Sequence, residues 1–140
     1  MNPDSSGLLV LPDRGRVLLN TQALLPELRI VGSWVDHRFQ RVHLRAGAAD
    51  KIRIKHKVTP GLSRLTTRYP DSSSSGGGTS WTYNTTVQRI VGGRIEAQVV
   101  MKTVVELGNK QANGLSYGLV TSYCLGTVLC PAWTNNIIGG

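Results

Sequence analysis

Charged and apolar side chains alternate through residues 51–58, and this alternation constrains the fold more than any other feature of the chain. The run reads Lys-Ile-Arg-Ile-Lys-His-Lys-Val. In a β-strand, residues two apart share a face, so a strand here would carry its cations on one side and its isoleucines on the other. We therefore expect a half-buried strand with one basic face. The cations of that face are Lys51, Arg53, Lys55 and Lys57.

A second alternating run precedes the first, from Phe39 to Arg45. The small residues 46–50 between the two runs suit a short loop. Paired as a hairpin, the two strands would place their basic side chains on one patch, where His43 adds charge at mildly acidic pH. The predicted patch consists of Arg41, His43, Arg45, Lys51, Arg53, Lys55 and Lys57.

The positive charge of the whole chain lies in this same region. The net charge is +8 at pH 7, and the segment from Arg38 to Arg68 alone holds nine basic residues and one acid. Like charges that face each other on a sheet cost roughly a few tenths of a kcal/mol per pair, so we expect an anion to cover them. A nucleic-acid surface is favoured. The alternative is a solvated strand face whose charges prevent edge-to-edge aggregation.

Further strands are indicated on both sides of the basic region. Short apolar runs at 8–11 and 17–19 flank a turn and predict an N-terminal β-hairpin. Residues 30–35 predict another strand, and 81–90 and 94–105 predict a hairpin around a Gly-Gly pair. Strands that follow one another in sequence favour an antiparallel sheet.

After residue 106 the apolar spacing becomes helical, which predicts two C-terminal helices at 110–129 and 132–138. The fold class is therefore α+β: an N-terminal β-hairpin, an antiparallel sheet of about five further strands, and two helices that pack on a dimer partner. We expect a single domain of 140 residues. Its parts are the hairpin in 1–20, the sheet in 30–105 with a flexible loop at 70–80, and the helical part in 107–138.

Two runs of small residues suggest contacts between copies. The tract Ser72, Ser73, Ser74, Ser75, Gly76, Gly77 and Gly78 predicts a mobile, exposed loop. Gly114, Gly118, Ser122 and Gly126 recur every four residues of the first predicted helix. Such a stripe permits close approach of a partner's backbone, or lets the helix lie low on its own sheet.

Nothing in the sequence predicts catalysis, a metal site or a cofactor. Cys124 and Cys130 lie six apart on the predicted helix, so we expect two buried thiols, with a bridge between subunits left open. Trp81 and Tyr83 share a strand face, where core packing and base stacking are both open. No apolar run is long enough to span a membrane, and the polar residues 1–6 do not predict a signal peptide.

The order of these parts resembles the coat proteins of single-stranded RNA bacteriophages, the levivirus family. The resemblance rests on the apolar runs at 8–11 and 17–19, the basic strand at 51–58 and the ending at 135–140. It implies dimers that share a sheet, interlock their helices and form an icosahedral shell around RNA. It further implies RNA against the basic patch and contacts between subunits through residues 72–78. Arg41, His43 and Arg53 stand where the family has small hydroxyl residues, which favours electrostatic packaging over a pocket for one base.

We therefore expect a non-enzymatic capsid protein in the virion, assembled in the cytoplasm of a bacterial host. Its partners would be copies of itself and single-stranded RNA, including a genomic hairpin, with no membrane and no small-molecule substrate. The alternative is a small nucleic-acid-binding module of the ribosome-associated or single-strand-binding type. That module would share the basic patch but stay small in solution.

Overall fold

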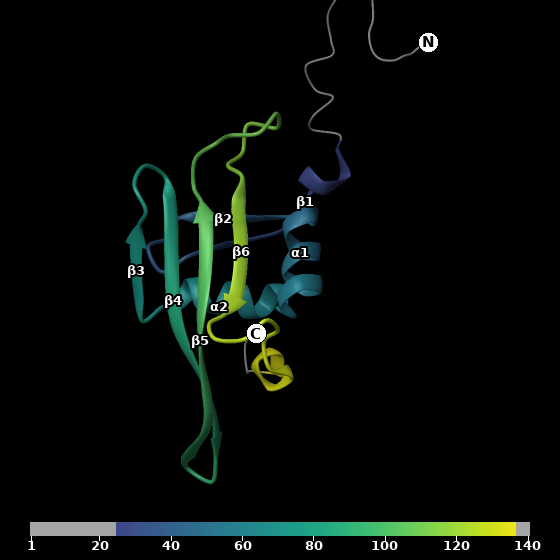
Figure 1. Cartoon of the computed structure of the whole chain (residues 1–140). Coiled ribbons are helices and arrows are strands. Elements are labelled where there is room, and N and C mark those ends of the chain that lie inside the picture. Colours follow the sequence, from purple (N-terminus) through teal and green to yellow (C-terminus); the bar gives the residue numbers. More distant parts are fainter. Residues whose placement is uncertain (1–24, 137–140) are drawn as a thin grey trace, which may run out of the picture.

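A computed structural model describes residues 25–136 (Figure 1). The predicted N-terminal hairpin lies outside these residues, as do residues 137–140 of the predicted ending. The elements in chain order are the 3-10 helix η2 (Pro26–Leu28), β1 (Ile30–Val35), β2 (Arg41–Arg45), α1 (Ala46–His56), α2 (Pro60–Arg68), β3 (Ser72–Ser75), β4 (Ser80–Val91), β5 (Arg94–Glu106), β6 (Gly118–Cys124) and the 3-10 helix η3 (Ala132–Asn136).

The largest element is an antiparallel sheet in the order β3-β4-β5-β6. The predicted hairpin at 81–90 and 94–105 is confirmed: β4 and β5 pair along their whole length around Gly92 and Gly93. Both glycines have positive φ, at 57° and 78°, as a two-residue hairpin turn requires. The hairpin formed by β4 and β5 extends beyond the body of the molecule (Figure 1).

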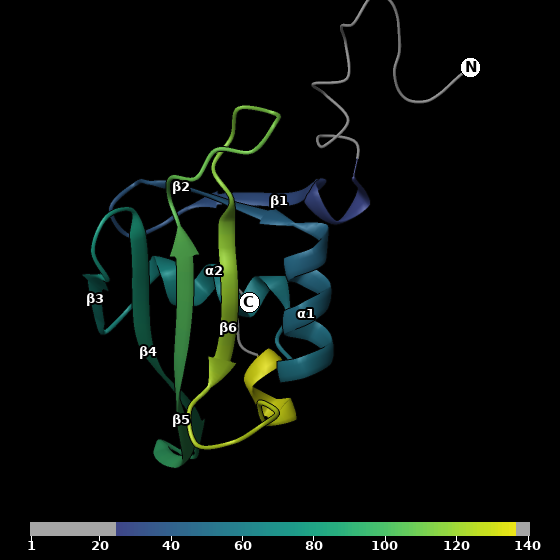
Figure 2. The ribbon, with the colours of Figure 1, turned by 45° about the horizontal axis from the view of Figure 1, so that its top comes forward.

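The α+β class is confirmed, but the helices lie between a β-hairpin and the sheet, not at the C-terminus. β1 and β2 form a separate two-stranded sheet. α2 lies behind the main sheet, where it contacts β4 and β5, and α1 lies beside β6 (Figure 2). The expected α+β arrangement with C-terminal helices is therefore wrong.

The predicted basic strand at 51–58 is also wrong, because residues Ala46–His56 form α1. The alternation of lysine and isoleucine suits a strand, but only Ile52 of the two isoleucines is buried, while Ile54 is 65% exposed. Ile52 shares its helix face with Ala48, four residues earlier, and both enter the core. The helix ends where Lys57 adopts a left-handed conformation, with φ at 57°.

α2 begins with a capping threonine followed by a proline. The Thr59 hydroxyl accepts a hydrogen bond from the backbone N–H of Leu62, and Pro60 occupies the first helical turn. A threonine cap followed by proline is a common helix start. Its buried face is polar: the hydroxyls of Thr66, Thr103 and Ser122 form a chain with oxygen distances of 3.1 and 2.8 Å.

The predicted helix at 110–129 is absent, and residues Gly118–Cys124 form β6, paired with β5. Gly114, Gly118 and Gly126 all have positive φ, between 80° and 90°. A right-handed helix excludes that conformation. The second predicted helix survives only as η3.

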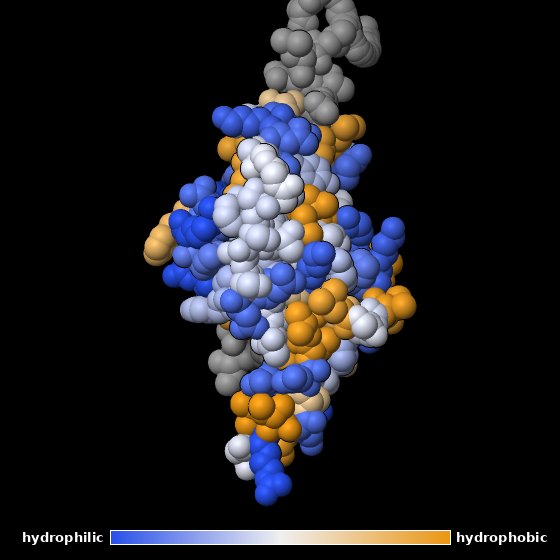
Figure 3. Space-filling view, turned by 60° about the vertical axis from the view of Figure 1, so that its left-hand side comes forward, coloured by the Kyte–Doolittle hydropathy of each residue, from blue (hydrophilic) through white to orange (hydrophobic). Residues whose placement is uncertain are grey.

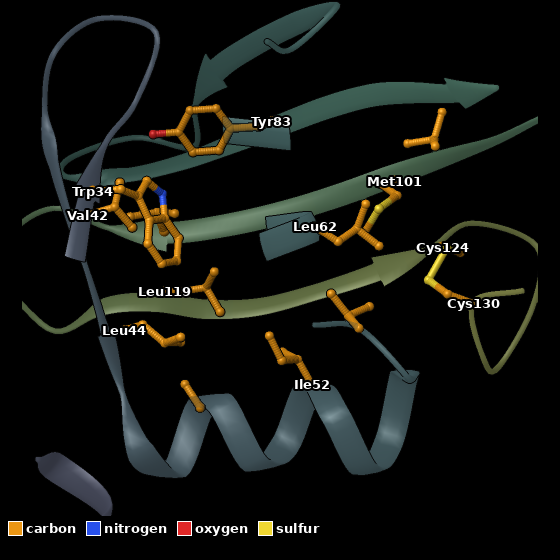
Figure 4. Packing of buried hydrophobic residues seen from close by; sticks show 14 residues of the cluster. Trp34, Val42, Leu44, Ile52, Leu62, Tyr83, Met101, Leu119, Cys124 and Cys130 are labelled. Carbon is orange, nitrogen blue, oxygen red and sulfur yellow. A yellow bond between two sulfur atoms is a disulfide. The ribbon is translucent and has the colours of Figure 1, made fainter. Parts of the chain in front are cut away.

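One hydrophobic core joins all the layers (Figure 4). Trp34 and Leu44 enter it from the small sheet, Ile52 from α1, and Met101 and Leu119 from the main sheet. Both helices of the same chain therefore contribute to the core, through Ile52 of α1 and Leu62 of α2.

Cys124 and Cys130 form a disulfide within the chain, with their Cα atoms 5.3 Å apart. The prediction of two buried thiols is therefore wrong. It assumed a helix between them, whereas the chain leaves β6 at Cys124 and turns back through residues 125–129. Such a reversal brings two cysteines within bonding range.

Candidate nucleic-acid interface

The predicted patch does not form one face, because the cations of α1 lie on two sides of the helix. Residues four apart in a helix are neighbours, so Lys51 lies beside Lys55, while Arg53 lies on the other side of the exposed Ile54. Lys57 follows the last residue of α1. Arg53, Lys55 and Lys57 are exposed and Lys51 is half-buried.

Arg53 also has a partner on its own helix. Its Nη2 lies 3.3 Å from Oδ1 of Asp50, and both side chains are about two-thirds exposed. Exposed pairs of this kind contribute little to stability and are screened by salt. Arg53 and Lys55 are therefore the cations of α1 that are exposed to a polyanion.

Arg45 does not belong to the interface. Only 1% of it is exposed, and its guanidinium donates hydrogen bonds to backbone carbonyls on either side of it. The acceptors are the carbonyls of Leu28, Leu115, Ser116 and Tyr117 and the Asn113 side chain, at 2.6 to 3.3 Å. Arg45 therefore fixes the segment that leads into β6, and its prediction as an RNA-binding residue is wrong.

Arg41 and His43 lie on β2, apart from α1. Arg41 is exposed, whereas His43 is half-buried with its Nδ1 3.3 Å from the Ser33 hydroxyl. Burial lowers the pKa of His43, and the nearby charges of Arg45 and Arg41 lower it further. A lowered pKa favours the neutral ring, in the direction opposite to the added charge expected from the sequence.

The turn between β1 and β2 is built on a buried carboxylate that the sequence analysis overlooked. Asp36 is fully buried, and its Oδ1 accepts hydrogen bonds from the backbone N–H groups of Arg38 and Gln40, both at 2.8 Å. Its Oδ2 accepts a 2.7 Å hydrogen bond from the Tyr83 hydroxyl. Burial and this bond to Asp36 raise the pKa of Tyr83, so the phenol remains a donor.

Aromatic rings and arginines gather around this turn. The Arg38 guanidinium carbon lies 3.5 Å from the centre of the Trp81 ring, and that of Arg68 lies 5.5 Å from the centre of the Phe39 ring. Phe39 is 75% exposed and has φ at 63°. In the sequence, an arginine directly precedes an aromatic residue twice, at Arg38-Phe39 and at Arg68-Tyr69. A count of charges alone does not show this arrangement.

The cations of residues 38–68 therefore lie on the elements that precede the main sheet in the chain, which we together call the basic layer. It comprises the β1–β2 turn, β2, α1 and α2, and Arg64 and Arg68 lie four residues apart on α2. The described residues beyond it, 69–136, hold four basic and three acidic residues. The charge asymmetry predicted from the sequence is thus a difference in net charge between the basic layer and residues 69–136.

The predicted stripe for helix packing between subunits does not exist as a face. Gly114 and Gly126 lie in turns, and Ser122 bonds within the core. A Cβ on Gly118 would lie 2.0 Å from the backbone oxygen of His43. This glycine therefore permits close approach of β2 to β6 within the chain, whereas both readings of the stripe assumed a helix that is absent.

The serine-glycine tract is partly ordered. Ser72–Ser75 form the edge strand β3, paired with β4, and only residues 76–79 form the turn between the strands. The Ser73 hydroxyl lies 3.0 Å from Nε2 of His37. The expectation of a wholly mobile loop is wrong, while contact between subunits at these exposed residues stays a prediction.

Two groups of exposed apolar side chains lie outside the basic layer, and Phe39 and Ile54 are exposed within it. Ile90, Val91 and Ile95 are 51 to 61% exposed near the end of the β4–β5 hairpin. Figure 3 shows apolar surface at this lower end of the molecule, next to polar atoms at the tip. A second group, Leu125, Val128 and Leu129, lies in the segment closed by the disulfide. The Leu125 N–H donates to the Val100 carbonyl, which ties this segment to β5.

No protein-family model, curated protein or solved structure matches this chain. Within residues 25–136, no helix has the length and apolar character needed to cross a membrane. The same residues contain no cluster of three histidine, cysteine or acidic side chains that could hold a metal ion.

Proposed function

We propose that this protein is a non-enzymatic coat protein that assembles from copies of itself and packages single-stranded RNA. The observation that carries the proposal is the concentration of cations on the basic layer, together with groups of exposed apolar side chains elsewhere. Cations gather on the basic layer, while apolar side chains gather at the hairpin end and in residues 125–129. Basic surfaces attract polyanions without reading sequence, and exposed apolar groups favour contact with another protein surface.

The resemblance to single-stranded RNA bacteriophage coat proteins supports this proposal in a changed form. Interlocking C-terminal helices are not carried over, since the described C-terminal region holds β6 and η3. RNA would lie against helix α1 and its neighbours instead of a sheet face. Lys51, Lys55 and Lys57 would contact phosphates, with Arg41 at the margin.

The apolar hairpin end suits contact with a second copy of the chain. β3 covers β4 only as far as Asn84, and β6 covers β5 only from Met101 onward. Among residues 25–136, no strand therefore pairs with the edges of the outer part of the β4–β5 hairpin. Exposed edges with apolar side chains favour pairing with another chain.

The disulfide fits a protein that acts outside the reducing cytosol. Disulfides persist on virion and cell surfaces but are rare in the cytosol. A shell assembled in a bacterial cytoplasm would form the Cys124–Cys130 bond after release, and the bond would then hold residues 125–129 in place.

A small nucleic-acid-binding module is the second candidate. It is favoured by the core, to which both helices of the same chain contribute, so the fold does not need a partner's helices. This candidate shares the basic layer but predicts no large assembly.

Two variants of equal charge test the RNA-binding surface. Lys51→Ser with Lys55→Ser removes two cations of α1, and Lys102→Ser with Lys110→Ser removes two from the other layer. Binding of single-stranded RNA is measured over a range of salt concentrations. The first variant should bind more weakly, and its salt slope should fall by about 1.4, at about 0.7 for each lost phosphate contact. Equal effects of the two variants would contradict the assignment of RNA to the basic layer.

A further inference from the structure

We propose that Phe39 is a stacking platform for one unpaired base of single-stranded RNA, with Arg68 beside it for the adjoining phosphate. The proposal rests on the proposed RNA binding and gives it a specific contact. It concerns the β1–β2 turn, which contains none of the RNA-binding residues predicted from the sequence.

The first argument is the conformation of Phe39. Its φ of 63° is the left-handed conformation, which costs free energy in any residue with a side chain. Three quarters of the residue is nevertheless exposed to solvent. An apolar ring that is both strained and exposed contributes little to the fold, and such strain gathers at functional positions.

The second argument is the rigidity of the turn that carries the ring. Asp36 accepts hydrogen bonds from the N–H groups on both sides of Phe39, and the Phe39 N–H donates to the Asp36 carbonyl at 3.0 Å. The His37 N–H donates to the Thr67 carbonyl, which holds the turn against the end of α2. A backbone held in one conformation loses little entropy when a ligand binds the side chain that it displays.

The third argument is the chemistry around the ring. Arg68 lies 5.5 Å from the ring centre, and Tyr69, which follows it, is 65% exposed. The Arg38 guanidinium is stacked on Trp81 and lies 3.7 Å from Asp36, so Arg68 is the cation left to meet a phosphate. Aromatic side chains beside cations are the usual way to hold an unpaired base and its backbone.

Three forms of the full-length protein test the proposal. Phe39→Gly removes the ring and relieves the backbone, so loss of binding cannot be attributed to misfolding. Phe39→Tyr keeps the ring and is the matched control. Each form is titrated into a fluorescent oligouridine of about ten nucleotides and, separately, into a linear polyphosphate that carries charge without bases.

Phe39→Gly should weaken oligouridine binding by about 5- to 150-fold, the range for loss of one stacked base. Its polyphosphate binding should stay within about twofold of the wild type, and Phe39→Tyr should bind both ligands like the wild type. With 5-iodouridine in the oligonucleotide, irradiation should attach it to the wild-type peptide that contains Phe39.

The outcomes separate this proposal from the one on which it depends. If the wild type binds both ligands and Phe39→Gly binds oligouridine equally well, the stacking platform is overturned and RNA binding stands. An equal loss for both ligands also overturns it, since the effect is then not on a base. If the wild type binds neither ligand, both proposals fail.

Discussion

The hydroxyl of Tyr83 on β4 donates a 2.7 Å hydrogen bond to the buried carboxylate of Asp36, at the end of β1. This contact joins the small sheet to the main sheet. The same carboxylate organises the turn that displays Phe39. The core and the candidate RNA contact therefore depend on one buried group.

Replacement of Tyr83 by Phe should destabilise the protein by about 2 kcal/mol, because the buried carboxylate loses a hydrogen bond. Urea denaturation measures the change. Tyr123→Phe is the control, since the Tyr123 ring contacts His56 but its hydroxyl is not part of this network; it should stay within about 0.5 kcal/mol of the wild type. Equal stability of the Tyr83 variant and the wild type would mean that the contact carries no net free energy.

Replacement of Arg45 by Lys should cost about 3 kcal/mol although the charge is retained. An ammonium group cannot replace the forked set of donors that reaches Leu28 on one side and Ser116 and Tyr117 on the other. Arg41→Lys, at an exposed position of the same strand, should change stability by less than about 0.5 kcal/mol. The two unfolding curves give the comparison directly, and similar curves would place Arg45 at the surface.

Removal of the disulfide should cost about 2 kcal/mol, as the short loop between Cys124 and Cys130 predicts. The double variant with serine at both positions is compared with the wild type by urea denaturation, with and without reductant. Reductant should destabilise only the wild type. Insensitivity of the wild type to reductant would show that the two thiols are free.

Stability should fall as the pH is lowered through 6.5, in part because of His43. The folded protein lowers the pKa of His43 from 6.5, so the unfolded chain binds the proton more tightly and acid favours unfolding. His43→Gln cannot take up that proton and should show a smaller fall between pH 7.5 and 5. Urea denaturation midpoints measured across this pH range test the prediction. An unchanged or steeper fall in the stability of the variant would contradict the lowered pKa of His43.

Local signals in the sequence predicted some parts of the fold and not others. The β4–β5 hairpin was predictable because two glycines and their flanking β-formers specify it locally. α1 was not, since alternation of lysine and isoleucine suits a strand and only burial of Ile52 beside Ala48 favours the helix. The disulfide was not predicted for a similar reason, because the predicted distance between its cysteines depended on a helix that is absent.

The candidate site was predictable in charge but not in shape. Counting residues located the basic layer, since net charge does not depend on secondary structure. Arg45 was misplaced because its buried acceptors come from residues about 70 positions later in the chain. Phe39 was missed because its exposure depends on Asp36, whose partners become visible only in three dimensions.

The most direct test of the proposed function is size-exclusion chromatography of the expressed protein, with absorbance recorded at 260 and 280 nm. The account predicts a peak at particle size with a nucleic-acid spectrum that nuclease does not remove. The variant with Lys51→Ser and Lys55→Ser should carry less nucleic acid per protein. A peak at monomer or dimer size, unchanged by altered salt or added RNA, would contradict the coat-protein proposal and favour the small nucleic-acid-binding module.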